Sequence, residues 1–229
     1  GRLLLEEDPE ATARVLARFV PFDAAAVRLL GDLLRRLGCS AVLADISPLG
    51  IAAGTAAALP VVLVENFTWD WIYQVYIESV PGLRRPAELL QQAFDLATVR
   101  VRCQPVCGGM RTPHTVSPIS RPPRWGRGCT RRELGVDLER PVVLVTMGGT
   151  PWRPTVLAPM LARRDVTFVI PGGADDYRRE GNLVLLPHHS RCYHPDLVAA
   201  ADAVVGKGGY STVAEAFHAG TPLGFVPRR

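Results

Sequence analysis

Residues 204–215 combine a short apolar run, a glycine-rich turn and a predicted helix in a way that suits an anionic ligand. The glycines of the turn are Gly206, Gly208 and Gly209. Glycine tolerates positive φ and lets another group approach the backbone closely. The first turn of the following helix would offer unpaired N–H groups and the positive end of the helix dipole. The pattern therefore predicts a site for phosphate.

Four side chains near this turn could contribute to such a site. Ser211 and Thr212 can donate hydroxyl hydrogen bonds to phosphate oxygens, and Lys207 can add a positive charge. Glu215 could accept hydrogen bonds from ribose hydroxyls, as acidic residues do in dinucleotide folds. Two alternatives stay open: Thr212-x-x-Glu215 also matches a capping box that only satisfies backbone donors, and the glycines could form a plain tight turn.

Two common nucleotide motifs are not matched. A Walker A loop needs Ser or Thr directly after its lysine, whereas Gly208 follows Lys207. The turn also lacks the G-x-G-x-x-G pattern followed by a distant acidic residue, so we do not expect a nicotinamide cofactor.

Hydrophobic patterns predict the elements that would position this loop. In the first half, helices are expected over 9–37, 51–59, 69–78 and 86–95, and strands over 41–45, 60–66 and 98–103. In the second half, strands are expected over 141–149, 166–173, 182–187, 201–209 and 223–227, and helices over 130–134, 154–163, 194–201 and 211–220. Such alternation implies parallel sheets that bind ligands at the carboxyl ends of their strands. We expect an α/β fold in which two Rossmann-like domains face a cleft.

A stretch rich in proline and glycine separates the two series of elements. It predicts an N-terminal domain over 1–111, a linker over 112–127 and a C-terminal domain over 128–229. Because the chain begins without Met and stops within a motif, we expect it to be a fragment in which both domains are incomplete.

The composition excludes several classes of protein. With 48% hydrophobic and 21% charged residues, the chain can bury a core. A scattered net charge of +4 favours an anionic ligand or peripheral contact with an anionic membrane surface, and it does not predict nucleic-acid binding. Five cysteines without dense spacing, and no recognisable signal peptide, favour a reducing, cytoplasmic location. The almost complete replacement of lysine by arginine is typical of a GC-rich, bacterial genome.

Three stretches resemble GT-B glycosyltransferases. Residues 195–227, PDLVAAADAVVGKGGYSTVAEAFHAGTPLGFVP, resemble the donor-binding half of MurG-type and family-28 enzymes. Residues 42–73, with the segment Asn66-Phe67-Thr68-Trp69-Asp70, are similar to the glycosyltransferase-like region fused to plant L-arabinose kinases. PVVLVTMGG (141–149) looks like the first strand and glycine turn of the C-terminal domain. The motifs are more specific for the fold than for the reaction.

The resemblance implies that residues 1–111 form the acceptor-side domain and residues 128–229 the nucleotide-sugar-binding domain. It also implies roles for individual residues. Those expected to hold the diphosphate of a nucleoside-diphosphate sugar, with a UDP-sugar as the expected donor, are Lys207, Gly208, Gly209, Ser211 and Thr212. Glu215 would bind ribose, Gly148 and Gly149 would lie near the phosphates or the sugar, and residues 185–188 would face the nucleobase. The first strand of the family, whose glycine turn often carries a histidine, and the acidic or amide residues after the last strand are not found within the sequence.

Sugar transfer with inversion needs a base for the acceptor hydroxyl and stabilisation of the departing diphosphate. The helix N-terminus could stabilise the diphosphate without a metal ion. Asp45, at a strand end, and Asp70, after the next strand, are the candidate bases, with helix capping or structural hydrogen bonding as the alternative for both.

Histidines and aromatic residues leave further alternatives open. His188, His189 and His194 are close in sequence, but we interpret them as part of an exposed loop rather than as a metal site. The aromatic residues that could stack on an acceptor, or simply pack in the core, are Trp69, Trp71, Tyr73 and Tyr76. We therefore predict an inverting, metal-independent glycosyltransferase without a separate cofactor, binding a nucleotide sugar and an unidentified acceptor. The alternatives are a non-catalytic sugar-nucleotide-binding or regulatory domain and a sugar-nucleotide epimerase.

Overall fold

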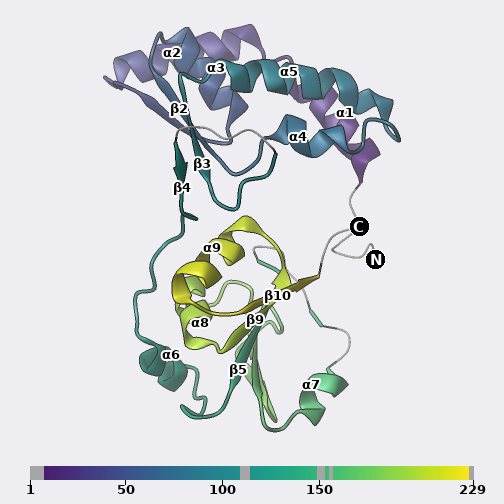
Figure 1. Ribbon diagram of the computed structural model, residues 1–229, viewed down its shortest axis with the longest axis vertical. Helices are drawn as coiled ribbons and strands as arrows, with labels where there is room; N and C mark the ends of the chain where they lie inside the picture. Colours follow the sequence, from purple (N-terminus) through teal and green to yellow (C-terminus); the bar gives the residue numbers. More distant parts are fainter. Residues whose placement is uncertain (1–7, 109–113, 149–152, 155–156, 227–229) are drawn as a thin grey trace. The chain divides into compact units, whose positions relative to one another are not determined.

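The computed structural model describes residues 8–108, 114–148, 153–154 and 157–226 (Figure 1). Its contacts divide the chain into two compact units, Glu7–Ser117 and a second made mainly of Pro118–Arg229. Each unit contains its own sheet of parallel strands. The predicted α/β class is therefore confirmed, and the division falls inside the segment predicted to be a linker, 112–127.

The first unit is built on four parallel strands in the order β1-β2-β3-β4. They are β1 (Val42–Asp45), β2 (Val61–Glu65), β3 (Val99–Cys103) and β4 (Thr115–Val116). The helices are α1 (Pro9–Phe19), α2 (Ala24–Arg36), α3 (Pro48–Ala56), α4 (Trp69–Gln74) and α5 (Arg84–Asp95), with a 3-10 turn η1 (Pro81–Leu83) before α5.

Close packing of α3 against the sheet shapes the core of this unit. A Cβ atom added to Gly54 would lie 2.7 Å from Val61 Cγ2 and 2.9 Å from Val42 Cγ2, so only glycine fits at this contact. Leu63 of β2 and Phe94 of α5 are almost fully buried in the same apolar cluster. This packing fixes the ends of β2 and α5, where polar side chains gather.

Among its described residues, the second unit has six strands in the order β10-β9-β5-β6-β8-β7, in which the β7–β8 pair is antiparallel and the other pairs are parallel. The strands are β5 (Val142–Thr146), β6 (Thr167–Pro171), β7 (Arg178–Glu180), β8 (Leu183–Leu186), β9 (Ala203–Lys207) and β10 (Leu223–Val226). The helices are α6 (Arg127–Glu133), α7 (Ala158–Ala162), α8 (His194–Ala200) and α9 (Tyr210–Ala219). The strands β6, β7 and β8, which follow β5 in the sequence, lie on one side of it. The later strands β9 and β10 lie on its other side. The order therefore reverses between β5 and β9.

Part of the predicted linker packs on the second unit. The buried Asp196 of α8 accepts hydrogen bonds from the backbone N–H groups of Arg124 (2.6 Å) and Trp125 (3.1 Å). The guanidinium of Arg124 lies 4.0 Å from the centre of the Tyr193 ring. Residues 124 and 125 are thus held against α8, while Pro118 and Ile119 contact His218 and Tyr210 of α9.

An ion pair between a buried arginine and a partly exposed aspartate connects α6 to the sheet. Arg131 is 1% exposed, and its guanidinium donates to the Asp202 carboxylate (2.6 Å). The same guanidinium also donates to the carbonyls of Ala200 (3.0 Å), Leu138 (2.6 Å) and Arg140 (3.1 Å). Asp202 accepts further hydrogen bonds from Arg127 and from the Val142 N–H (2.7 Å) at the start of β5.

The charge of Asp202 depends on these donors. Burial acts to raise the pKa of Asp202, but hydrogen bonds from the two guanidinium groups and the Val142 N–H outweigh it and hold the pKa below its ordinary value of 3.8. A carboxylate with a lowered pKa in the folded state stabilises the fold above its unfolded pKa, and this contribution is lost as the pH falls through the folded pKa.

We predict that Asp202→Asn lowers the free energy of unfolding at pH 7 by about 1 kcal/mol, because charge-assisted hydrogen bonds are lost while the side chain is 39% exposed and partly screened. Urea unfolding of parent and variant measures this difference. It should shrink as the pH is lowered below 3.8. A difference that stays constant down to the acid transition would show that the carboxylate charge contributes nothing.

None of the helices among residues 8–108, 114–148 and 157–226 has the length and apolar character required to cross a bilayer.

Candidate functional site

The glycine-rich turn lies at the point where the strand order of the second sheet reverses. Thr146 ends β5, Lys207 ends the neighbouring β9, and Thr146 pairs with Gly206 across the two strands. After β9 the chain passes through Gly208 and Gly209 into α9. Open α/β sheets bind their ligands at such reversal points, at the carboxyl ends of the strands. The topology therefore places the predicted phosphate loop where this class of fold binds ligands.

Two glycines at this edge of the sheet are required, for different reasons, and a third is not. A Cβ atom on Gly206 would lie 2.1 Å from the Thr146 carbonyl oxygen, so this glycine lets β9 lie close to β5. Gly148 has a φ of +65°, which other residues rarely adopt. Around Gly209, by contrast, an added Cβ would meet nothing within 4 Å, and its φ of −73° suits any residue. Gly149, predicted to lie beside the phosphates, falls outside the described residues.

The N-terminus of α9 has no side-chain cap. The helix begins at Tyr210 with Gly209 as its N-cap, so the capping box left open as an alternative for Thr212 and Glu215 does not form. A capping box would place the N-cap at Thr212, three residues after the observed one, because a Ser-Thr pair signals a helix start more strongly than glycine does. Ser211 is exposed and Thr212 is 4% exposed. The first N–H groups of α9 have no acceptors within the helix itself.

A chain of hydrogen bonds connects β5, α8 and α9 beneath this turn. The Gly148 N–H donates to Thr146 Oγ1 (3.1 Å), and this hydroxyl lies 3.2 Å from His194 Nε2. His194 Nδ1 lies 2.5 Å from Glu215 Oε2, and the Glu215 side chain is only 5% exposed. With Nδ1 carrying the proton, each group in this chain donates to the next, from Gly148 to Thr146, His194 and Glu215.

The predicted helix over 194–201 includes His194, as observed, but the grouping of His194 with the histidines of an exposed loop is wrong. His194 is the first residue of α8, with a half-buried ring, and it is not part of an exposed loop. His188 and His189 differ, because both line a cavity of about 560 Å³. Within the described ranges, no three His, Cys, Asp or Glu residues are arranged to hold a metal ion.

That cavity lies along the same edge of the sheet. Its walls come from the turn after β6, at Gly172 and Ala174, and from Pro187 and His188 after β8, with Arg153 and Asp175 also lining it. Leu185 and Leu186 themselves are buried within β8. Of the residues 185–188 predicted to face a nucleobase, the last two therefore line an open space.

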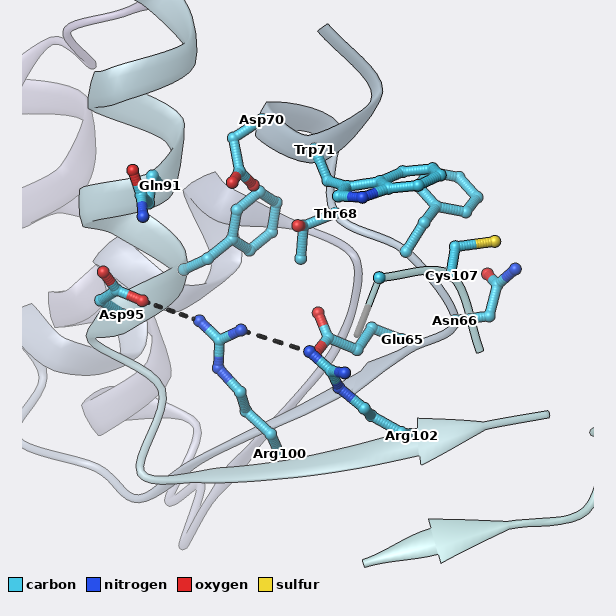
Figure 2. Close-up of a pocket in the computed structure, with 13 residues that line it drawn as sticks. Glu65, Asn66, Thr68, Asp70, Trp71, Gln91, Asp95, Arg100, Arg102 and Cys107 are labelled. Atoms are coloured by element: carbon cyan, nitrogen blue, oxygen red, sulfur yellow. Dashed lines mark hydrogen bonds and ion pairs between the residues drawn. The ribbon is translucent and has the colours of Figure 1, made fainter. Parts of the chain in front are cut away.

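The two candidate bases of the first unit lie in different surroundings. Asp45 is exposed at the end of β1. Asp70, in the first turn of α4, lines a cavity whose wall also includes Glu65 at the end of β2 (Figure 2). Asp70 Oδ1 and Glu65 Oε2 are buried and lack a hydrogen-bond partner among the described residues.

Glu65 was missed by sequence reasoning, and its charge environment is unusual. Its Oε1 lies 3.3 Å from Arg102 Nε and 3.5 Å from Arg100 Nη1. Burial raises the pKa of Glu65, and Asp70 adds to this effect, while the two arginines act to lower it. The signal was the alternation Arg100-Val101-Arg102 in β3, which puts two positive charges on one face of a buried strand beside the end of β2.

The aromatic residues divide between the two alternatives left open. Tyr73 and Tyr76 pack against the apolar core of the first unit. Trp69 and Trp71 are 39% and 41% exposed, and Trp71 also lines the cavity that contains Glu65.

Comparisons with known proteins agree with this architecture. No family model matches the chain. Over 191 residues it is 29% identical to L-arabinokinase of Arabidopsis thaliana. The aligned region covers 82% of this chain and 18% of that protein. The chain superposes on CalG4, the calicheamicin glycosyltransferase, with a TM-score of 0.59 and 16% identity over 95% of this chain and 64% of CalG4. It also superposes on glycosyltransferase SsfS6 from Streptomyces sp. SF2575, complexed with thymidine diphosphate, with a TM-score of 0.53 and 15% identity.

The chain has the GT-B fold of two Rossmann-like domains. This confirms the predicted resemblance at the level of the fold. The match covers 99% of this chain and 62% of SsfS6, so the chain spans less than two thirds of these glycosyltransferases and less than a fifth of L-arabinokinase.

We predict that His194 and Glu215 are energetically coupled. Either single substitution to Ala should destabilise the second unit, and His194→Ala leaves a buried carboxylate without its donor. Unfolding of the parent, both single variants and the double variant should give a coupling free energy of about 1–3 kcal/mol. Additive effects of the two substitutions would contradict the hydrogen bond.

Proposed function

We propose that the second unit binds the diphosphate of a nucleotide sugar and that the chain belongs to a protein that transfers the sugar to an acceptor. The observation that carries this proposal is the position of the Gly208–Gly209 turn and the α9 N-terminus, at the reversal point between β5 and β9. The GT-B fold supports it, and one protein with that fold, SsfS6, is complexed with thymidine diphosphate.

The proposed donor site follows from the positions of its residues. The N–H groups at the start of α9 and the exposed Ser211 hydroxyl would face the diphosphate, with Lys207 at the end of β9 adding positive charge. Glu215 Oε2 is hydrogen-bonded to His194, so the other carboxylate oxygen of Glu215 would accept hydrogen bonds from the ribose hydroxyls. The 560 Å³ cavity along the same edge of the sheet would take the nucleobase, and a UDP-sugar remains the proposed donor.

The chemistry proposed for transfer needs no metal ion. The diphosphate of a nucleotide sugar carries two negative charges and gains a third as its bond to the anomeric carbon breaks, and the helix end and Lys207 can stabilise this charge. A carboxylate of the first unit would accept the proton of the acceptor hydroxyl as the anomeric carbon is inverted. Asp70 suits this role better than Asp45, because it lines a cavity that holds a second carboxylate.

A second candidate function is sugar-nucleotide binding without catalysis. The similarity to L-arabinokinase favours it, because that name describes a kinase reaction and not sugar transfer. This chain covers 18% of that protein. Nucleotide binding is common to both candidates. Release of UDP from a UDP-sugar in the presence of acceptors would distinguish them.

We predict that the chain binds UDP in calorimetric titrations and that Gly209→Asp weakens this binding at least about tenfold. An added carboxylate would cap the α9 N–H groups and repel the diphosphate, at a cost of about 1.4 kcal/mol or more. Folding should be retained, because a Cβ on Gly209 meets nothing within 4 Å and Asp is a favourable N-cap. GDP and dTDP titrations identify the preferred base.

Gly126→Asp is the matched control. Gly126 is the N-cap of α6 with φ −70° and ψ 156°, close to the −73° and 141° of Gly209, and it too has open space around it. It lies before β5, away from the carboxyl ends of the strands, so UDP binding should be unchanged. Equal loss in both variants, or no UDP binding by the parent, would overturn the assigned site.

We also predict that EDTA leaves UDP binding within about twofold of its original affinity, because the positive charge at the site comes from the protein. Titrations with EDTA and with added Mg²⁺ measure this. A strong requirement for Mg²⁺ would show that a metal ion bridges the diphosphate and would end the metal-independent proposal.

A further inference from the structure

The first unit contains a cavity of about 190 Å³ that the proposed nucleotide site does not use. Figure 2 shows its labelled side chains gathered from the end of β2, from α4, from α5 and from β3. Cavities that hold drug-sized ligands are usually about 300–1,000 Å³. This one is therefore suited to a smaller ligand, of the size of a single sugar ring.

Two residues that line this cavity each have a buried carboxylate oxygen with no hydrogen-bond donor among the described residues. The Glu65 side chain is 2% exposed, and its Oε1 takes both arginine contacts while Oε2 has no partner in the described part of the chain. Asp70 Oδ1 is also buried without a partner among those residues. Because an unsatisfied buried acceptor costs free energy, these two atoms point to a ligand that supplies donors.

Both arginines in the cavity wall already form ion pairs with carboxylates. Arg100 contacts both Glu65 and Asp95 (3.0 Å), and Arg102 contacts Glu65. A phosphate or carboxylate ligand would have to displace these pairs and would meet the unpaired oxygens of Glu65 and Asp70. The cavity is therefore poorly suited to an anion.

A cation is disfavoured for the opposite reason. Two guanidinium groups lie in the wall beside the three carboxylates of Glu65, Asp70 and Asp95, so the charges nearly balance. The remaining polar lining consists of neutral groups, including the Gln91 amide and the Thr68 hydroxyl. Such a wall can both donate and accept hydrogen bonds.

Aromatic rings complete the surroundings. Phe67, Trp71 and Phe94 contribute to the wall, and Trp71 is partly exposed. Flat apolar rings beside carboxylates match a ligand with hydroxyl groups on its edge and C–H groups on its face.

We propose that this cavity binds a neutral, hydroxyl-rich ligand of monosaccharide size, whose hydroxyl groups donate to Glu65 Oε2 and Asp70 Oδ1 while its ring lies against Trp71. The two carboxylates hold the ligand by accepting from its hydroxyls, and Arg100 and Arg102 hold Glu65 in position. This proposal extends the proposed function, because Asp70 is also the candidate base there. Sugar binding is measured without nucleotide, so failure of this site can be told apart from failure of the nucleotide site of the second unit.

Saturation-transfer NMR and tryptophan fluorescence with D-glucose, D-galactose and D-xylose test the proposal on the intact chain. At least one of these sugars should bind, and Asp70→Asn and Glu65→Gln should each weaken it about fivefold or more, as expected for the loss of one hydrogen bond to a charged group. Binding should persist in Gly209→Asp, which separates this site from the nucleotide site.

Glu88→Gln is the control, because Glu88 lies on α5 in the same unit with its side chain 52% exposed and outside the cavity wall. It should bind the sugar as the parent does, and thermal unfolding should show that all variants fold. Failure of all three sugars to bind the parent overturns the proposal. So does preferential binding of tetramethylammonium or inorganic phosphate, or sugar binding that neither Asp70→Asn nor Glu65→Gln weakens.

Discussion

The contact between Gly206 and Thr146 is the constraint on which the second unit depends. The missing side chain at Gly206 lets β9 lie against β5 with the Thr146 carbonyl in the space that a Cβ would occupy. Because these two strands flank the reversal of strand order, their close approach sets the relative positions of the loop after β5 and the loop before α9. Every group assigned to diphosphate binding extends from one of these two loops or from the helix that follows.

The His194–Glu215 hydrogen bond supports that arrangement by connecting α8 to α9. It connects the first residue of α8 to the second turn of α9, and through the Thr146 hydroxyl it reaches the backbone after β5. A carboxylate that would meet ribose is therefore already held by the protein. Fixing a binding group before its ligand arrives reduces the entropy lost on binding.

Much of the fold could be predicted from the sequence, because alternating apolar strands and helices with glycine stops are local signals. The β9–turn–α9 unit follows from residues 204–220 alone, including Gly220, which ends the helix with φ +65°. Contacts between distant residues were not predictable in the same way. His194 pairs with a residue 21 positions away, and Glu65 meets arginines on another strand. A capping-box motif also competed with the true helix start, and local sequence gave no means of choosing between them.

The arginine-rich composition has a practical consequence for the site. Lys207 is the single lysine of the chain, and it stands at the end of β9, beside the turn into α9. Reagents that modify primary amines therefore have one side-chain target, with the terminal amine as the other. Acylation at that position would mark a single place on the molecule, at the edge of the sheet where the strand order reverses.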